Sequence, residues 1–112
     1  MESILTSIKK LLGLDEEYTH FDTDIVVHIN SALFRLHQLG IGPTECLSIK
    51  DKETKWSELF LDRNDLEATK TYVYLKVRLV FDPPQTSFLL EAINKQIAEL
   101  EWTLNVQVEG GI

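Results

Sequence analysis

The spacing of apolar residues constrains this fold most, because it follows a helical repeat over most of the chain. Two stretches carry one apolar stripe each, a third is apolar on two sides, and a fourth has a heptad-like seam. These stretches are residues 3–12, 22–39, 64–81 and 87–107. Glycine and proline separate them at Gly13, Gly40, Gly42–Pro43 and Pro83–Pro84. The pattern predicts a mainly α fold of four helices, with the third as the most buried.

The stretch between the second and third helices, residues 44–61, lacks this repeat. Weak alternation from Cys46 to Ile49 and around Trp56 flanks the charged run Lys50–Glu53. We predict a small β-hairpin or irregular insertion here, and one helical turn at residues 57–61. At 112 residues, the chain suits a single domain over residues 1–112. Its end, residues 105–112, contains two glycines and is expected to fray or to dock elsewhere.

The acidic loop at residues 15–24 is the first candidate metal site. A calcium loop counted from Asp15 requires glycine at its sixth position and glutamate at its twelfth, where this chain has His20 and Val26. His28 and His37 are nine residues apart, which does not match a helical zinc pair. We therefore expect no metal ion and no cofactor.

Catalytic groups are also poorly placed. Cys46 is the only cysteine, lacks a flanking catalytic signature, and is expected to be a small buried hydrophobic residue. Glu91, Glu99 and Glu101 fall on a helix face expected to be solvated, with no paired acid and base. Because no set of residues converges on a reaction, we predict that the chain is not an enzyme.

The net charge of −7 argues against a protein that grips phosphate backbones. Trp56 and Trp102 suit either a core or a contact surface, and the pattern leaves both possibilities open.

Several blocks of residues along nearly the whole chain form a recognisable series. They are Ile8–Leu14, Phe21–Ile25 with His28–Asn30, Gln38–Pro43, Lys70–Leu79 with Phe81–Pro84, and Glu99–Trp102. In these blocks, which are structural rather than catalytic motifs, the chain resembles the head–tail connector, or adaptor, proteins of tailed bacteriophages of Gram-positive hosts.

The resemblance implies a helical fold with a small β element and a homo-oligomeric, dodecameric ring below the portal. Such a ring would extend the DNA channel, contact the portal protein and a further neck or tail protein, and let DNA pass without sequence-specific binding. It implies no membrane contact and no catalytic residue. The protein would lie in the virion neck, and in the host cytoplasm during assembly.

Ring or portal contacts are expected in the irregular parts, because segments too short to build a core often persist as contact sites. The candidates are Ile49, Lys50, Asp51, Lys52, Glu53, Trp56, Trp102, Val106, Val108 and Ile112. The alternative function is a small intracellular protein-binding regulatory module of phage or bacterial origin, which would not associate with virions.

Overall fold

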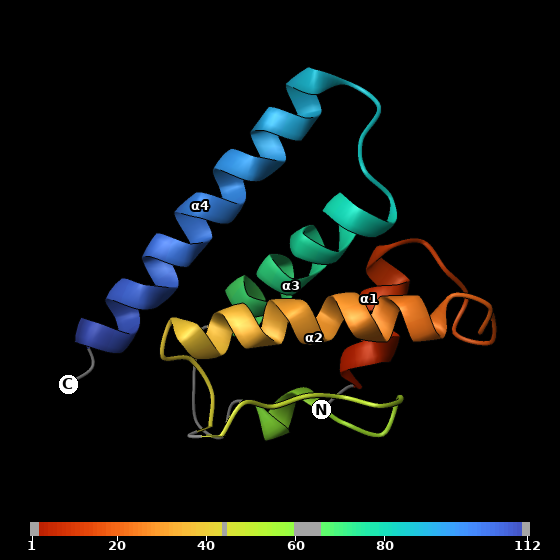
Figure 1. Ribbon diagram of the computed structural model, residues 1–112, viewed down its shortest axis with the longest axis horizontal. Helices are drawn as coiled ribbons and strands as arrows, with labels where there is room; N and C mark the ends of the chain where they lie inside the picture. Colours follow the sequence, from red (N-terminus) through yellow and green to blue (C-terminus); the bar gives the residue numbers. More distant parts are fainter. Residues whose placement is uncertain (1–2, 44, 60–65, 111–112) are drawn as a thin grey trace.

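The computed structural model describes residues 3–43, 45–59 and 66–110, and these residues form helices joined by loops (Figure 1). The elements in chain order are α1 (Ile4–Leu11), α2 (Asp22–Gln38), the short 3₁₀ helix η1 (Trp56–Glu58), α3 (Leu66–Phe81) and α4 (Ser87–Gly110). The predicted mainly α fold with four helices is confirmed.

Both ends of α1 are as the sequence predicts. The Ser3 side chain accepts a hydrogen bond from the Thr6 amide at 3.2 Å, which caps the first turn. Gly13 has a φ of +82°, a left-handed conformation that glycine adopts easily. The sequence favours Asp22, an aspartate just before an apolar stripe, as the N-cap of the second helix, but α2 begins at Asp22 and the cap position is Phe21. The Asp22 carboxylate instead lies 2.8 Å from Lys9 of α1.

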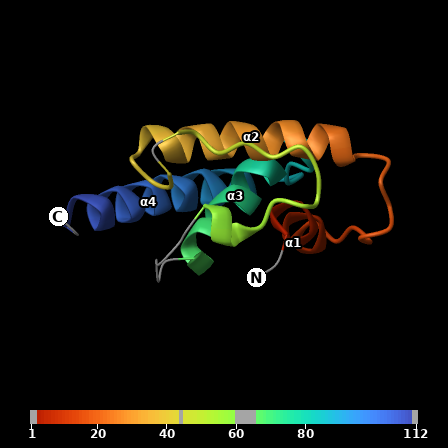
Figure 2. The same ribbon diagram turned by 90° about the horizontal axis from the view of Figure 1, so that it is seen from below.

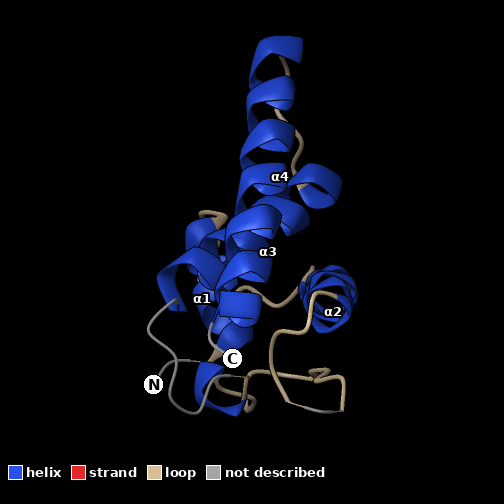
Figure 3. Cartoon of the chain, turned by 90° about the vertical axis from the view of Figure 1, so that its left-hand side faces the viewer, coloured by secondary structure: helices blue, strands red, loops and turns tan. Residues whose placement is uncertain are grey.

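α3 packs against α1, α2 and α4, which makes it the central helix. Figure 3 shows α4 passing one side of α3, with α2 seen nearly end-on. Tyr72, Val73 and Val77 are fully buried, so the predicted two-sided apolar character of this helix is confirmed for these residues. Val80, which the helical repeat places on the same face as Val73 and Val77, is 61 % exposed near the helix end. The predicted start of this helix at residue 64 lies outside the described residues.

Of the two alternatives predicted for residues 44–61, the β-hairpin is wrong for the described part, and the irregular insertion is what the structure shows. The bridge there joins Lys55 to Ser3, at the start of the chain, and no strand forms among the described residues. The Ile4 amide donates to the Thr54 carbonyl at 3.0 Å, while the Asn30 side chain bonds both backbone groups of Ile49. These bonds tie the segment to α2 and to the start of α1, and it runs as a loop along α2 and ends in η1 (Figure 2).

α4 is longer than predicted and continues to Gly110. Ile93, Ile97 and Leu104 are buried as the seam predicts, whereas Leu90 is 38 % exposed. All side chains from residue 85 to residue 92 are exposed, so the first turns of α4 project from the body. The molecule measures 41 × 35 × 19 Å, so it is about half as thick as it is wide.

Candidate assembly surfaces

The charged turn Lys50–Glu53 is exposed and is held at both ends. Before it, the Asn30 Nδ2 donates to the Ile49 carbonyl at 3.0 Å and the Ile49 amide donates to Asn30 Oδ1 at 2.7 Å. Within it, the Glu53 amide donates to the Asp51 carboxylate at 2.9 Å. The charged side chains of the turn are therefore presented to solvent on a fixed backbone.

Two of the predicted contact residues, Ile49 and Trp56, are buried and anchor this turn to the core. Ile49 is 2 % exposed and Trp56 is fully buried. The Trp56 Nε1 donates to the Ser7 hydroxyl of α1 at 3.0 Å, and that hydroxyl donates to the Ser3 carbonyl at 2.6 Å. Trp56 therefore belongs to the core, and the exposed contact surface here is limited to the charged run between the two anchors.

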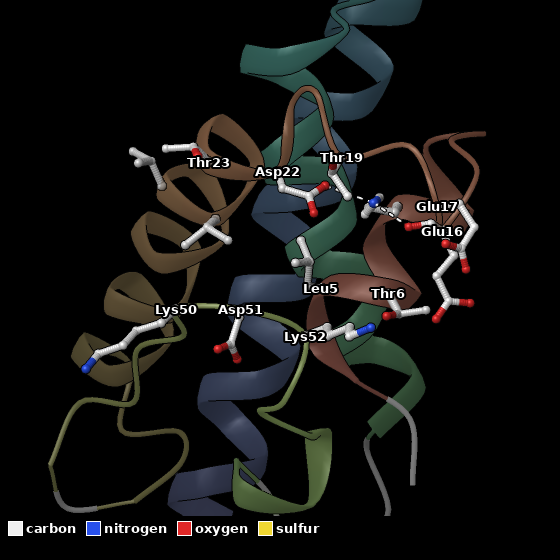
Figure 4. Close-up of a pocket in the computed structure, with 13 residues that line it drawn as sticks. Leu5, Thr6, Glu16, Glu17, Thr19, Asp22, Thr23, Lys50, Asp51 and Lys52 are labelled. Carbon is white, nitrogen blue, oxygen red and sulfur yellow. Dashed lines mark hydrogen bonds and ion pairs between the residues drawn. The ribbon is translucent and has the colours of Figure 1, made fainter.

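A cavity of about 460 Å³ lies between this turn, α1 and the start of α2. Figure 4 shows Lys50, Asp51 and Lys52 on one side of it, with Glu16 and Glu17 across from them. The apolar side chains in its lining are Leu5, Val26 and Val27. The charged turn is thus one wall of a pocket.

Lys9 is the buried charge of this pocket. Its residue is 2 % exposed, and its ammonium lies 2.8 Å from Asp22 Oδ1 and donates to the Glu16 carbonyl at 2.9 Å. These contacts tie α1 to the acidic loop and to the first turn of α2. From the sequence, Lys9 is expected only to favour the negative C-terminal end of the first helix. Its burial could not be predicted, because the pattern of one helix does not show which residues of a later loop will cover it.

The pocket is lined by apolar side chains and by charges of both signs. Its lining contains no histidine or cysteine, and Lys9 already has two oxygen partners. Within residues 3–43, 45–59 and 66–110, there is no cluster of three or more histidine, cysteine, aspartate or glutamate side chains that could hold a metal ion. A cavity lined by apolar side chains and charges of both signs has the mixed chemistry of protein contact surfaces.

The second candidate surface lies on α4. Trp102 is 70 % exposed and Val106 is 41 % exposed, and both face away from the buried Ile97 and Leu104. The side chain of Val108 lies outside the described side chains, although its backbone is part of α4, and Ile112 lies outside the described residues altogether. An exposed tryptophan on a helix is typical of a contact surface.

Polar contacts hold this half of α4 against the body. The Arg35 guanidinium of α2 forms an ion pair with Glu101 at 3.1 Å, and the Tyr72 hydroxyl of α3 donates to the same carboxylate at 2.6 Å. One turn later, Asn105 Nδ2 donates to the Leu39 carbonyl at 3.2 Å. These bonds fix the rotation of α4 and therefore the direction in which Trp102 points.

The network around Glu101 also changes the acidity of its members. Burial raises the pKa of Glu101, but the hydrogen bonds from Arg35 and Tyr72, together with the positive charges of Arg35 and Lys76, outweigh burial and bring that pKa below its ordinary value. Burial, followed by the hydrogen bond to Glu101, raises the pKa of Tyr72. The carboxylate thus stays ionised and the phenol stays protonated, which is the state that makes these bonds.

Two predictions about individual side chains are wrong. Glu101 was expected on a solvated face, but residues on two other helices bind it. Cys46 was expected to be buried and is exposed. The alternation explains the cysteine, because Ile49 is buried and Leu47 is partly buried, which turns the intervening positions and Cys46 outward. His28 and His37 are partly buried, and His20 packs on the Phe21 ring with centroids 4.7 Å apart.

No helix in the described part of the chain is both long and apolar enough to span a membrane. A family model described as phage connector protein matches residues 4–111. Neither the curated proteins nor the solved structures contain a significant match to the chain.

Proposed function

The chain belongs to the phage connector protein family, and on this premise we propose that it forms an adaptor ring in the neck of a tailed phage. The ring lies below the portal, extends the DNA channel and joins the head to the tail. The observation that carries this proposal is the family match over residues 4–111, nearly the whole chain. The portal protein and a further neck or tail protein are the proposed partners.

The charge of the chain supports a role beside passing DNA. With a net charge of −7, the wall of a channel built from this protein would repel the phosphate backbone. DNA would then pass without the tight phosphate contacts that clustered lysines and arginines make.

The exposed surfaces supply the proposed contacts in the ring. Lys50–Glu53, Trp102 and Val106 are exposed and sit on supported backbone, so they can meet a neighbour or the portal without unfolding. Ile49 and Trp56 contribute indirectly, by holding the turn in place. Val108 and Ile112 remain proposed contacts on the basis of the sequence, and a truncation after Val106 tests them.

Mass spectrometry of purified phage particles tests the proposed function. We expect the protein in complete particles, and we expect a phage that cannot make it to accumulate heads without joined tails. Electron microscopy of the same lysates shows which parts are joined. Absence of the protein from purified particles would contradict the proposal and favour the regulatory alternative, which predicts binding to an intracellular protein instead.

A further inference from the structure

Two groups of large apolar side chains are exposed on different helices. The first, which we name the α4 outer face, consists of Phe88, Trp102 and Val106, which are 78 %, 70 % and 41 % exposed. The second, which we name the α2 stripe, consists of Val27 and Phe34, which are 56 % and 54 % exposed. Exposed aromatic residues grouped on one helix face usually mark a contact with another molecule.

Helix geometry places the members of each group on one face. Phe88 and Val106 are eighteen residues apart, which is about five turns, and Trp102 precedes Val106 by about one turn. This face lies opposite the buried Ile93 and Ile97.

On α2, Val27 and Phe34 are seven residues apart, which is about two turns. The exposed Ser31 lies between them, and Gln38 continues the same face.

The charges around these groups favour a protein partner over a membrane or nucleic acid. Glu91, Lys95 and Glu99 lie on the same side of α4 between Phe88 and Trp102, so this face carries more acidic than basic charge, whereas an anionic lipid or a phosphate backbone calls for clustered lysine and arginine.

Beside the α2 stripe, the Arg35 side chain is 43 % exposed, and Lys50, Asp51 and Lys52 line a cavity together with Val27. The charge beside the stripe is therefore mainly positive, and for a chain with a net charge of −7 such a surface is where a second copy would meet the least repulsion.

We propose that the α4 outer face of one copy packs on the α2 stripe of a second copy. The two groups lie on different elements, so the contact is heterologous, whereas an isologous dimer would need one self-complementary patch. A heterologous contact repeats from copy to copy, and it closes into a ring when the rotation between copies allows. The inference rests on the proposed ring for its biological context and names the pair of surfaces that neighbouring copies use.

The size of the two surfaces predicts a weak contact between free copies. The α4 outer face spans about 27 Å from Phe88 to Val106, and the α2 stripe about 11 Å from Val27 to Phe34, at helical rise. Helices pack with axes about 8–10 Å apart, so each copy would bury a few hundred Å², less than the roughly 800 Å² typical of stable complexes. Free protein should therefore associate measurably only at high concentration, while a ring gains two such contacts for each copy.

Sedimentation of the full chain, under reducing conditions that keep the exposed Cys46 from forming disulfides, tests the pairing. Wild-type protein should self-associate as its concentration approaches the millimolar range. Phe34→Glu and Trp102→Glu should each remain monomeric, because each variant lacks one of the two surfaces. An equimolar mixture of the two variants should form a one-to-one dimer, since one variant retains the α4 outer face and the other retains the α2 stripe.

Leu11→Glu is the matched control, because it makes the same substitution at an apolar side chain that is 50 % exposed on α1. It should associate like the wild type, and circular dichroism should show all three variants folded. Normal self-association of Phe34→Glu, a mixture that stays monomeric, or wild-type protein that stays monomeric at millimolar concentration would each overturn the pairing. Sedimentation tests the pairing of the two surfaces, and mass spectrometry of particles tests the proposed neck function. The two experiments are independent, so a failure of the pairing can be told apart from a failure of the proposed function.

Discussion

Trp56 is enclosed by the core and hydrogen-bonds to Ser7, whereas Trp102 projects from α4. Replacing Trp56 with alanine should lower the free energy of unfolding by about 3–5 kcal/mol, through lost burial and the cavity left behind. Trp102→Ala should change it by no more than about 0.5 kcal/mol, because an exposed side chain loses little on truncation. Denaturant unfolding of both variants measures the difference, and equal effects would contradict the two assignments.

Glu101 gives the protein an acid-sensitive contact. Its pKa in the folded chain lies below the ordinary value of 4.5, so its bonds contribute stability above that pH and lose it as the pH falls through the folded-state pKa. Glu101→Gln should cost about 1–2 kcal/mol at neutral pH, the lower part of the range for charged hydrogen bonds because Arg35 is partly exposed. The variant should also lose less stability than the wild type on acidification.

Glu99→Gln is the matched control for this pH dependence, because Glu99 is exposed two residues earlier on the same helix. Thermal unfolding from pH 7 down to pH 3 should follow the wild-type curve for Glu99→Gln and a flatter curve for Glu101→Gln. Identical curves for all three proteins would show that the Glu101 network adds nothing to stability.

Among the elements, α3 decides the stability of the core, because it packs on the other three α-helices. Val77→Ala should lower the free energy of unfolding by about 1–4 kcal/mol, since Val77 is fully buried. Val80→Ala makes the same change on the same helix at a side chain that is 61 % exposed, and should have little effect. Chemical denaturation compares the two, and a denaturation midpoint unchanged by Val77→Ala would contradict the central position of α3.

The helices could be predicted from the sequence because each depends on signals within a few residues. Ser3 and Gly13 lie at the ends of α1, and the apolar repeat identifies the buried face of each helix. The path of the loop at residues 45–59, and the choice between a hairpin and an irregular insertion, could not be predicted, because its backbone bonds Asn30, nineteen residues from Ile49, and the start of α1. Local alternation carries no information about partners so distant.

At the scale of the whole molecule, the candidate surfaces also depend on contacts between residues far apart in the sequence, which local patterns do not reveal. Exposure of Trp102 depends on the rotation of α4, which Arg35 and Tyr72 set from other helices through Glu101. A helical pattern could identify Trp102 as lying off the seam, but only the packed structure shows it projecting into solvent. Phe34 and Phe88 carried no motif, and they became candidates only when the fold left them uncovered.

The charged turn offers a test at the level of the assembled particle. We expect the double variant Lys50→Ala/Lys52→Ala to fold normally, because both side chains are exposed, and to reduce the yield of tailed, infectious particles. The physical reason is that the Lys50–Glu53 turn is held by Asn30, so loss of its positive charges changes a preformed contact surface rather than the fold.

Gln85→Glu/Gln96→Glu is the control for this test, because it makes the same change in net charge at exposed positions away from the turn. It should leave the particle yield close to that of the wild type. Plaque titre and electron microscopy of lysates report the outcome, with circular dichroism of the purified variants confirming that each is folded. A normal yield of tailed particles from the lysine variant would remove the turn from the proposed contacts, because a rigid, charged surface that tolerates this change cannot contribute much to binding in the neck.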